Sequence, residues 1–249
     1  MTIQPSRSAS PAAIAIIGVI VAGLGAWLIV NSAFFDIRDV RVHGARTISE
    51  EEILRLAAIR NGTNLIMLDT GQVASRLLRD PRVREAVVER DLPTTAVIRV
   101  VERRPGGWVE GPDGFAVVAG DGTILETVPA APSKLPSLGS WSGSPVVGER
   151  VEGFDGPLRI TSTMVASLLR QVEAASLEGT AVVLELREGG SILYGQPTQV
   201  GAKNRAVAAM LEWAAGEGLD IRTLDVRAPS APSLQPVRGP KISSPISTS

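Results

Sequence analysis

The residues that most often do chemistry in proteins are few and scattered along this chain. Histidine occurs once, at His43, and cysteine is absent. These counts exclude disulfides, thiolate nucleophiles, iron–sulfur clusters, and zinc sites built from cysteines or from several histidines. The motifs of serine hydrolases, zinc peptidases and P-loop nucleotide-binding proteins are missing from the sequence. We therefore expect no catalytic site, no metal site and no cofactor, and we interpret His43 as a structural or exposed residue at a strand end.

A glycine-rich stretch at Gly120, Asp121 and Gly122 has the residue types that can cradle a phosphate group. A phosphate loop is followed by a helix and by a lysine that reaches the phosphate, and neither feature is present here. The stretch lies instead between two predicted strands, at 115–118 and 123–125, and it predicts a hairpin turn. We expect no small-molecule substrate.

Pairs of carboxylates are the other candidates for catalysis, because a glycosidase needs two of them across a cleft. Glu51 and Glu52 are adjacent on a predicted helix, and Glu102 and Glu110 lie near predicted strands. Solvated helix and strand faces explain both pairs without a reaction. The formal net charge of −1 gives no general basic field for nucleic acid. The composition therefore favours a protein that binds other proteins over an enzyme or a nucleic-acid-binding protein.

An uncharged apolar stretch near the amino terminus predicts the first structural element. Residues 12–31 are long enough as a helix, at about 1.5 Å per residue, to cross the roughly 30 Å hydrocarbon layer of a bilayer. A cleaved signal peptide is the alternative, with a weak cleavage candidate at 31–33. Arg7 and the terminal amine favour a cytoplasmic location for the short tail, residues 1–11. We predict a single-pass cell-membrane protein whose carboxy-terminal part is extracytoplasmic.

The next stretch, residues 35–103, predicts a small domain of two helices on a three-stranded sheet. Ser49 opens a helix and Glu52 follows three residues later, which is the spacing of a capping box. The predicted order is strand, helix, helix, strand, strand, with strands at 37–42, 83–91 and 95–103. The sequences VRVHGARTISEEEIL (40–54) and VVERRP (100–105), in this order, resemble a POTRA domain.

The remaining chain predicts a second domain, residues 104–228, made of short strands and two helices. The helices are expected at 161–175 and 202–215, and the last strand at 219–227. A Pro- and Ser-rich tail, residues 229–249, is expected to be disordered. The predicted fold class is therefore α+β: a single transmembrane helix, a POTRA-like β-α-α-β-β domain, and a mixed β-rich domain with two helices.

Several short sequences in the second domain resemble the β-domain of the bacterial cell-division family FtsQ/DivIB. They are VVAGDGTILE (117–126), LPSL (135–138), VLELREGGSILYG (183–195) with Lys203 following, and LDVR (224–227). Their order after a membrane anchor and a POTRA-like domain is typical of that family. The resemblance implies a divisome scaffold at the septum that binds FtsB-like and FtsL-like bitopic proteins and other divisome proteins. It further implies that the scaffold links early and late assembly with septal wall synthesis.

The resemblance also implies where a partner binds, because the family's partner strand docks near the last strand of the β-domain. Such a strand would add to an exposed sheet edge through main-chain hydrogen bonds. In this sequence that docking stretch is 223–234. The residues of the predicted site are Thr223, Leu224, Asp225, Val226, Arg227 and Ala228, with Arg205 and Trp213 on the preceding helix. Pro229 and Pro232 lack amide donors, so we expect pairing to be strongest before them. The alternative is an internal strand that takes no partner.

A second hypothesis for the function is a secretion or envelope-assembly protein, because POTRA domains also receive unfolded client polypeptides. That hypothesis predicts several POTRA repeats and a β-barrel. This sequence contains one such repeat and a helical anchor, which favours the division scaffold.

Overall fold

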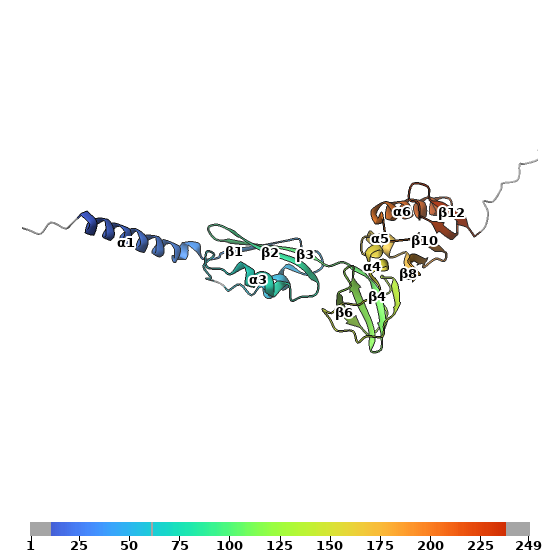
Figure 1. Cartoon of the computed structure of the whole chain (residues 1–249), viewed down its shortest axis with the longest axis horizontal. Coiled ribbons are helices and arrows are strands. Elements are labelled where there is room, and N and C mark those ends of the chain that lie inside the picture. Colours follow the sequence, from blue (N-terminus) through green and yellow to red (C-terminus); the bar gives the residue numbers. More distant parts are fainter. Residues whose placement is uncertain (1–10, 61, 238–249) are drawn as a thin grey trace, which may run out of the picture. The chain divides into compact units, whose positions relative to one another are not determined.

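The computed structural model describes residues 11–60 and 62–237 (Figure 1). The chain divides between Glu102 and Arg103 into two compact units. The first unit contains the apolar helix and the POTRA-like region, and the second contains the β-rich region. Each unit has its own hydrophobic core.

Helix α1 (Pro11–Val30) is the apolar element that the sequence predicts. The span Ala15–Phe35 is long and apolar enough to cross a membrane. Large side chains along it, such as Val19 and Ile29, are exposed rather than buried in a protein core. An isolated helix with apolar side chains on all sides is suited to a lipid environment. A short 3-10 helix, Ala33–Phe35, follows it.

The POTRA-like region contains one sheet and two helices in the predicted order. The elements are β1 (Asp39–His43), α2 (Glu50–Ala57), α3 (Thr70–Leu77), β2 (Val83–Asp91) and β3 (Thr95–Glu102). The sheet order is β1-β3-β2, with β1 parallel and β2 antiparallel to the central strand β3. Ile53, Leu77 and Ile98 are fully buried in the core between helices and sheet. Alternation along the strands and the spacing of apolar residues on the helices explain this packing.

Local hydrogen bonds explain where the two helices begin. The Ser49 side chain accepts a hydrogen bond from the Glu52 amide at 3.2 Å, and Asp69 accepts one from the Gln72 amide at 2.9 Å. Each N-cap of this kind contributes about 1 kcal/mol. The Glu52 carboxylate, which a complete capping box would place on the Ser49 amide, accepts instead a hydrogen bond from Arg82 at 2.6 Å.

Glu102, at the end of β3, anchors the loop between β1 and α2. Its carboxylate accepts hydrogen bonds from the amides of Arg46 at 2.7 Å, Thr47 at 3.0 Å and Ile48 at 3.1 Å, and from the Thr47 hydroxyl. Burial alone would raise the pKa of Glu102, but these donors hold it below its usual value. The prediction of a merely solvated face is therefore wrong for this carboxylate, because the loop folds back onto it.

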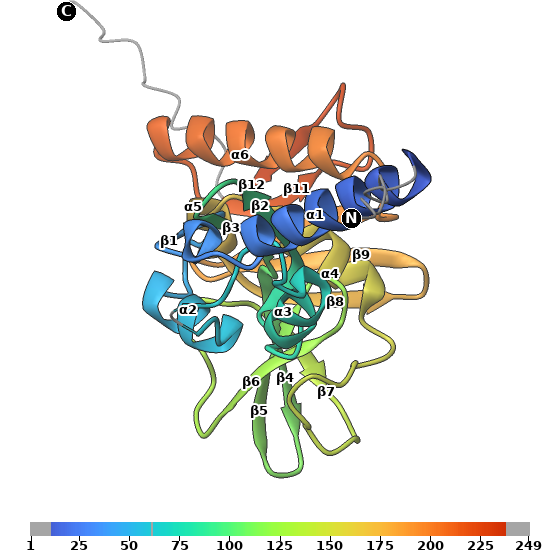
Figure 2. The ribbon, with the colours of Figure 1, turned by 90° about the vertical axis from the view of Figure 1, so that its left-hand side faces the viewer.

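The second unit contains a nine-stranded sheet in the order β12-β11-β10-β9-β8-β7-β4-β5-β6. Its strands are β4 (Pro105–Gly111), β5 (Gly114–Ala119), β6 (Ile124–Val128), β7 (Ser137–Ser140), β8 (Val172–Glu178), β9 (Ala181–Leu186), β10 (Ser191–Gly195), β11 (Ile221–Asp225) and β12 (Ser233–Pro236). Its helices are α4 (Asp155–Thr161), α5 (Ala166–Leu169) and α6 (Val200–Gly216). Helix α6 lies over the β10–β12 end of the sheet (Figure 2).

The predicted hairpin turn is confirmed between β5 and β6. The Gly122 amide donates to the Ala119 carbonyl at 2.9 Å, and Gly122 has φ +85°, a left-handed conformation that favours glycine. The two strands pair antiparallel on either side of this turn. The glycines here serve the backbone of a turn, as the sequence predicts.

The predicted helix at 161–175 is wrong: α4, α5 and strand β8 occupy and flank this stretch. The apolar spacing fits a helix, but Val165 is 62% exposed, and Val172 is buried at the start of a strand. Strand β8 pairs antiparallel with β9, and Gly179 at φ +64° forms the turn between them. This strand pairing overrides the helical pattern, and the described part of the second unit has three helices rather than two.

The chain also continues the sheet past residue 228. Strand β12 lies within the stretch 229–249 that the composition predicts to be disordered, and it pairs antiparallel with β11. Leu234 explains the order, because it packs against the core of the second unit. That prediction is therefore wrong for 233–236, and residues 238–249 lie outside the described part of the chain.

Candidate functional site

Strand β11, where the sequence predicts partner docking, is an internal strand. Thr223 is aligned with Ser191 of β10 on one side and with Gln235 of β12 on the other. The Val226 amide donates to the Leu193 carbonyl at 3.1 Å. The main chain of β11 is therefore used on both sides, and the prediction that Thr223 and its neighbours form an exposed edge is wrong. The missed strand β12 covers them.

The side chains at the predicted site fall into two groups. Leu224 and Val226 are fully buried in the core, and Thr223 is half-buried. Asp225 is half-buried, whereas Arg227 and Ala228 are exposed beyond the end of β11. On α6, Arg205 is exposed and the Trp213 side chain is 50% exposed. The structure therefore leaves a surface of polar strand-end residues and α6 side chains, rather than a continuous strand.

Within the described residues, β12 is the open edge at this end of the sheet, because it is the last strand in the sheet order. The Val237 amide donates to the Asp220 carbonyl on β11's side at 2.8 Å. Along an antiparallel strand, the N–H and C=O groups of successive residues point alternately to one neighbouring strand and to the other. Because those of Val237 point toward β11, those of Leu234 and Pro236 point away from it. Proline has no amide donor, so Leu234 supplies the outward-directed N–H of β12.

A buried polar network fixes α6 to the end of β10, beneath this edge. Lys203 is 3% exposed, and its Nζ donates to the carbonyls of Tyr194 and Gln196, both at 2.9 Å. The Tyr194 hydroxyl donates to Asn204 Oδ1 at 2.9 Å, and Asn204 Nδ2 donates to Thr163 Oγ1 at 3.0 Å. Every polar group in this network therefore has a partner, as buried polar groups require.

Charges connect the network to the predicted site residues. Arg227 donates to both carboxylate oxygens of Asp225, from Nε to Oδ1 at 3.0 Å and from Nη2 to Oδ2 at 2.6 Å. These hydrogen bonds are the main cause that lowers the pKa of Asp225, and the nearby Lys203 charge lowers it further. Burial lowers the pKa of Lys203, and the Asp225 charge opposes that shift. The three groups thus form a charge-alternating set at the end of β11.

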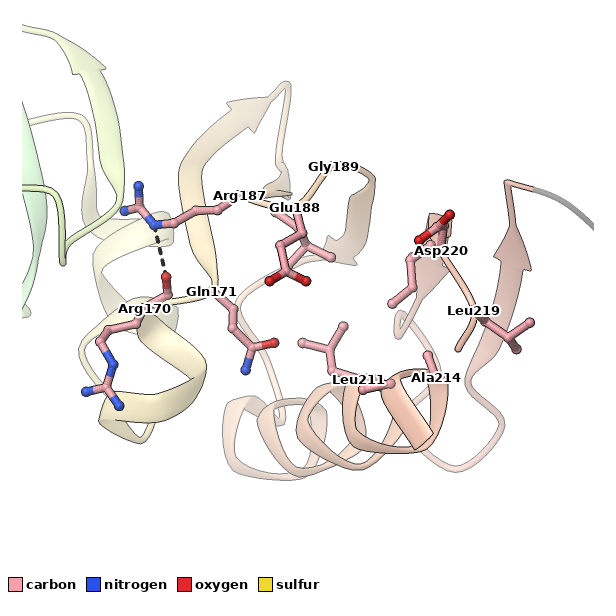
Figure 3. Close-up of a pocket in the computed structure, with 12 residues that line it drawn as sticks. Arg170, Gln171, Arg187, Glu188, Gly189, Leu211, Ala214, Leu219 and Asp220 are labelled. Atoms are coloured by element: carbon pink, nitrogen blue, oxygen red, sulfur yellow. Dashed lines mark hydrogen bonds between the residues drawn. The ribbon is translucent and has the colours of Figure 1, made fainter. Parts of the chain in front are cut away.

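A groove lies between α5, α6 and the β9–β10 turn. One pocket of about 210 Å³ has Leu211 and Ala214 facing the turn at Glu188 and Gly189 (Figure 3). A second hollow of about 340 Å³ adjoins it and shares Leu211. Apolar side chains of α6 form one wall of the pocket, and the charged residues Arg187 and Glu188 at the β9–β10 turn form the opposite wall. Within 11–60 and 62–237, no cluster of three or more His, Asp or Glu side chains could hold a metal ion.

The sequence interpretation gave no role to Lys203 and none to Asn204. A usable signal was present, because Lys203 stands at the start of the buried stripe that continues through Val207, Leu211 and Ala214. A charged residue in a buried helical stripe requires a hydrogen-bonded partner, so this position should have predicted a polar network.

The domain content identifies the class of protein first. Residues 35–103 match the family profile described as POTRA domain, FtsQ-type. Together with α1 and the β-rich unit, this match defines a POTRA-domain protein with a helix suited to membrane anchoring.

Related proteins then identify the family. The chain is 31% identical to the cell division protein FtsQ of Streptomyces collinus over 224 residues, which cover 86% of this chain and 83% of that protein. It is 29% identical to FtsQ of Mycobacterium leprae over 213 residues, or 86% of this chain and 59% of that protein. The chain therefore belongs to the FtsQ family of cell division proteins. A solved structure, the major extracytoplasmic domain of DivIB from Geobacillus stearothermophilus, is 20% identical with a TM-score of 0.33, and the match covers 45% of this chain and 95% of that one.

Proposed function

We propose that this cell division protein is a scaffold of the divisome and not an enzyme. It binds FtsB-like and FtsL-like bitopic proteins on the extracytoplasmic side of the septal membrane, and it links early and late assembly with septal wall synthesis. Membership of the FtsQ family supports the division role over the alternative of a secretion or envelope-assembly protein. The open edge of β12 is the single observation that carries the binding role.

The binding mode that the geometry supports is β-augmentation on β12. An added partner strand would accept a hydrogen bond from the Leu234 amide and donate to the carbonyls of Leu234 and Pro236. Pro232 and Pro236 bracket this short edge and limit the number of hydrogen bonds that it can form. The rest of the affinity must then come from exposed side chains of the same unit, and Arg227 and the α6 residues Arg205 and Trp213 are our candidates.

The test is a Leu234→Pro substitution in the full-length protein, reconstituted in lipid nanodiscs. Proline removes the outward-directed amide and places its ring where the partner strand would lie, so we expect at least a tenfold loss of affinity for a purified FtsB-like and FtsL-like pair. This loss corresponds to about 1.4 kcal/mol, the size of one hydrogen bond in a protein.

Leu234→Ala is the matched control, because it shortens the same side chain and keeps the amide. We expect this variant to retain most of the affinity. Unchanged binding by a Leu234→Pro variant whose urea unfolding transition matches that of the wild type would rule out pairing along β12.

A further inference from the structure

The segment that follows α1 is tied by hydrogen bonds to a loop of the POTRA domain. Asn64 Nδ2 donates to the Val30 carbonyl at 2.7 Å, across 34 positions of sequence. The Leu65 amide donates to the Phe35 carbonyl at 2.7 Å, and the Ile37 amide donates to the Thr63 carbonyl at 3.0 Å. The loop at 63–67 therefore runs beside the end of the apolar span, and a flexible linker does not separate them.

Asn64 makes this connection specific. The last carbonyls of a helix have no partner within the helix, and Asn64 supplies one for Val30. The same side chain accepts a hydrogen bond from the Ile66 amide at 2.9 Å through its Oδ1. One side chain thus fixes the local shape of the loop and attaches it to the end of α1.

Exposed apolar side chains gather at this junction. Phe34 is 61% exposed, and its ring meets that of Phe35 edge-on at 5.1 Å. Met67 is 59% exposed, two residues beyond the buried Leu65 whose amide binds the Phe35 carbonyl. Single exposed apolar residues are ordinary on protein surfaces, but these two adjoin the end of a membrane-suited span at Phe35.

We propose that the 63–67 loop of the POTRA domain lies in the interfacial layer of the lipid bilayer, with the Met67 side chain inserted beside Phe34. The occupant of this surface is lipid, because hydrogen bonds to Val30 and Phe35 hold the loop at the end of the exposed apolar span. Aromatic and flexible apolar side chains favour the boundary between headgroups and acyl chains. Asn64 is the positioning residue that sets the orientation of the domain against the membrane. The proposal rests on α1 being a membrane anchor.

The chain has no cysteine, so a single spin label can be placed without altering other residues. Met67→Cys is labelled in the full-length protein and reconstituted in vesicles of phosphatidylcholine and phosphatidylglycerol. Electron paramagnetic resonance then compares collisions of the label with oxygen, which enters the bilayer, and with a nickel chelate, which remains in water. Leu24→Cys in α1 and Val87→Cys on the POTRA sheet are the references, since both side chains are exposed, at 56% and 51%.

We expect the label at position 67 to resemble that at 24, with an oxygen-to-nickel collision ratio several-fold above that at 87. A ratio at 67 equal to that at 87, with 24 still inside the bilayer, would overturn the docking and leave the anchor intact. A label at 24 that is accessible to nickel would overturn the anchor as well as the docking. The two failures are therefore distinguishable.

The role of Asn64 has its own test in the same assay. Asn64→Ala removes the hydrogen bond to Val30, and we expect the ratio at position 67 to fall several-fold toward the value at 87. Thr63→Ala is the matched neighbour, because the Thr63 hydroxyl donates to the nearby Arg60 carbonyl at 2.7 Å rather than to the end of α1. If the oxygen-to-nickel ratio at position 67 is the same in the Asn64→Ala and Thr63→Ala variants, and their thermal transitions are unchanged, Asn64 does not orient the domain.

Discussion

Lys203 offers the sharpest test of how the second unit is held together. We consider Lys203→Met, which keeps much of the side-chain volume but removes the ammonium. The lost donor leaves the buried Tyr194 carbonyl without this partner, and an unpaired buried carbonyl costs about 1–3 kcal/mol. The Gln196 carbonyl keeps another donor, the Thr198 amide at 2.8 Å. The variant regains part of this free energy, because methionine carries no charge to desolvate. We therefore expect the free energy of unfolding to fall by about 1–3 kcal/mol at pH 7.

Urea unfolding of the full-length protein in detergent micelles, followed by tryptophan fluorescence, measures this change. Trp108, Trp141 and Trp213 all lie in the second unit, so the signal reports mainly on it. Lys134→Met is the matched control at an exposed lysine, and it should change the stability by less than about 0.5 kcal/mol. A loss below about 1 kcal/mol at Lys203 would refute the view that its hydrogen bonds hold α6 to β10.

Two further substitutions test the carboxylates. Glu102→Gln keeps one acceptor oxygen and loses the one that binds Thr47. We expect the free energy of unfolding to fall by about 1–2 kcal/mol and amide hydrogen exchange at 46–48 to become faster. The exposed Glu85→Gln is the control, and equal exchange rates in the two variants would contradict the role of Glu102 in holding the β1–α2 loop. The pKa of Asp225 is lower in the folded than in the unfolded chain, where it is about 3.9. The ionised carboxylate therefore stabilises the fold at a pH above the unfolded pKa, and this contribution disappears as the pH falls through the folded pKa. Asp225→Asn should therefore weaken the dependence of the urea midpoint on pH below about 4, and an unchanged pH profile would show that the bond to Arg227 contributes little.

The POTRA domain was predictable because its signals are local. Ser49 caps α2 within three residues, and β2 and β3 follow one another directly as an antiparallel pair. Strand β8 was not predictable in the same way, because the residues from Val165 to Val172 carry helical spacing, although Val172 begins a strand that pairs with β9 on one side and with β7 on the other. The helical spacing and the strand pairing conflict there, and the pairing determines the structure.

The prediction of an exposed edge at β11 was wrong for a different reason. The sequence predicted docking at the end of the sheet that β11 and β12 form. Because Pro229 and Pro232 follow β11, we did not predict a strand beyond it. Prolines are tolerated on an edge strand, because an outward-directed amide has no partner within the sheet. A sequence rule that treats proline as the end of a sheet therefore misses short edge strands such as β12.

The same prolines bear on the proposed function. An open sheet edge attracts unwanted strands as well as partners, and proteins limit this hazard by making the edge short and placing proline in it. Strand β12 is four residues long, with proline just before it at Pro232 and at its end at Pro236. So few main-chain hydrogen bonds cannot select one partner, since any extended peptide can form them. On the proposed function, selectivity must come from side chains whose positions are fixed. Lys203 contributes to that fixation, because it holds α6 and the end of β10 in place while its charge lies beside the Asp225–Arg227 pair.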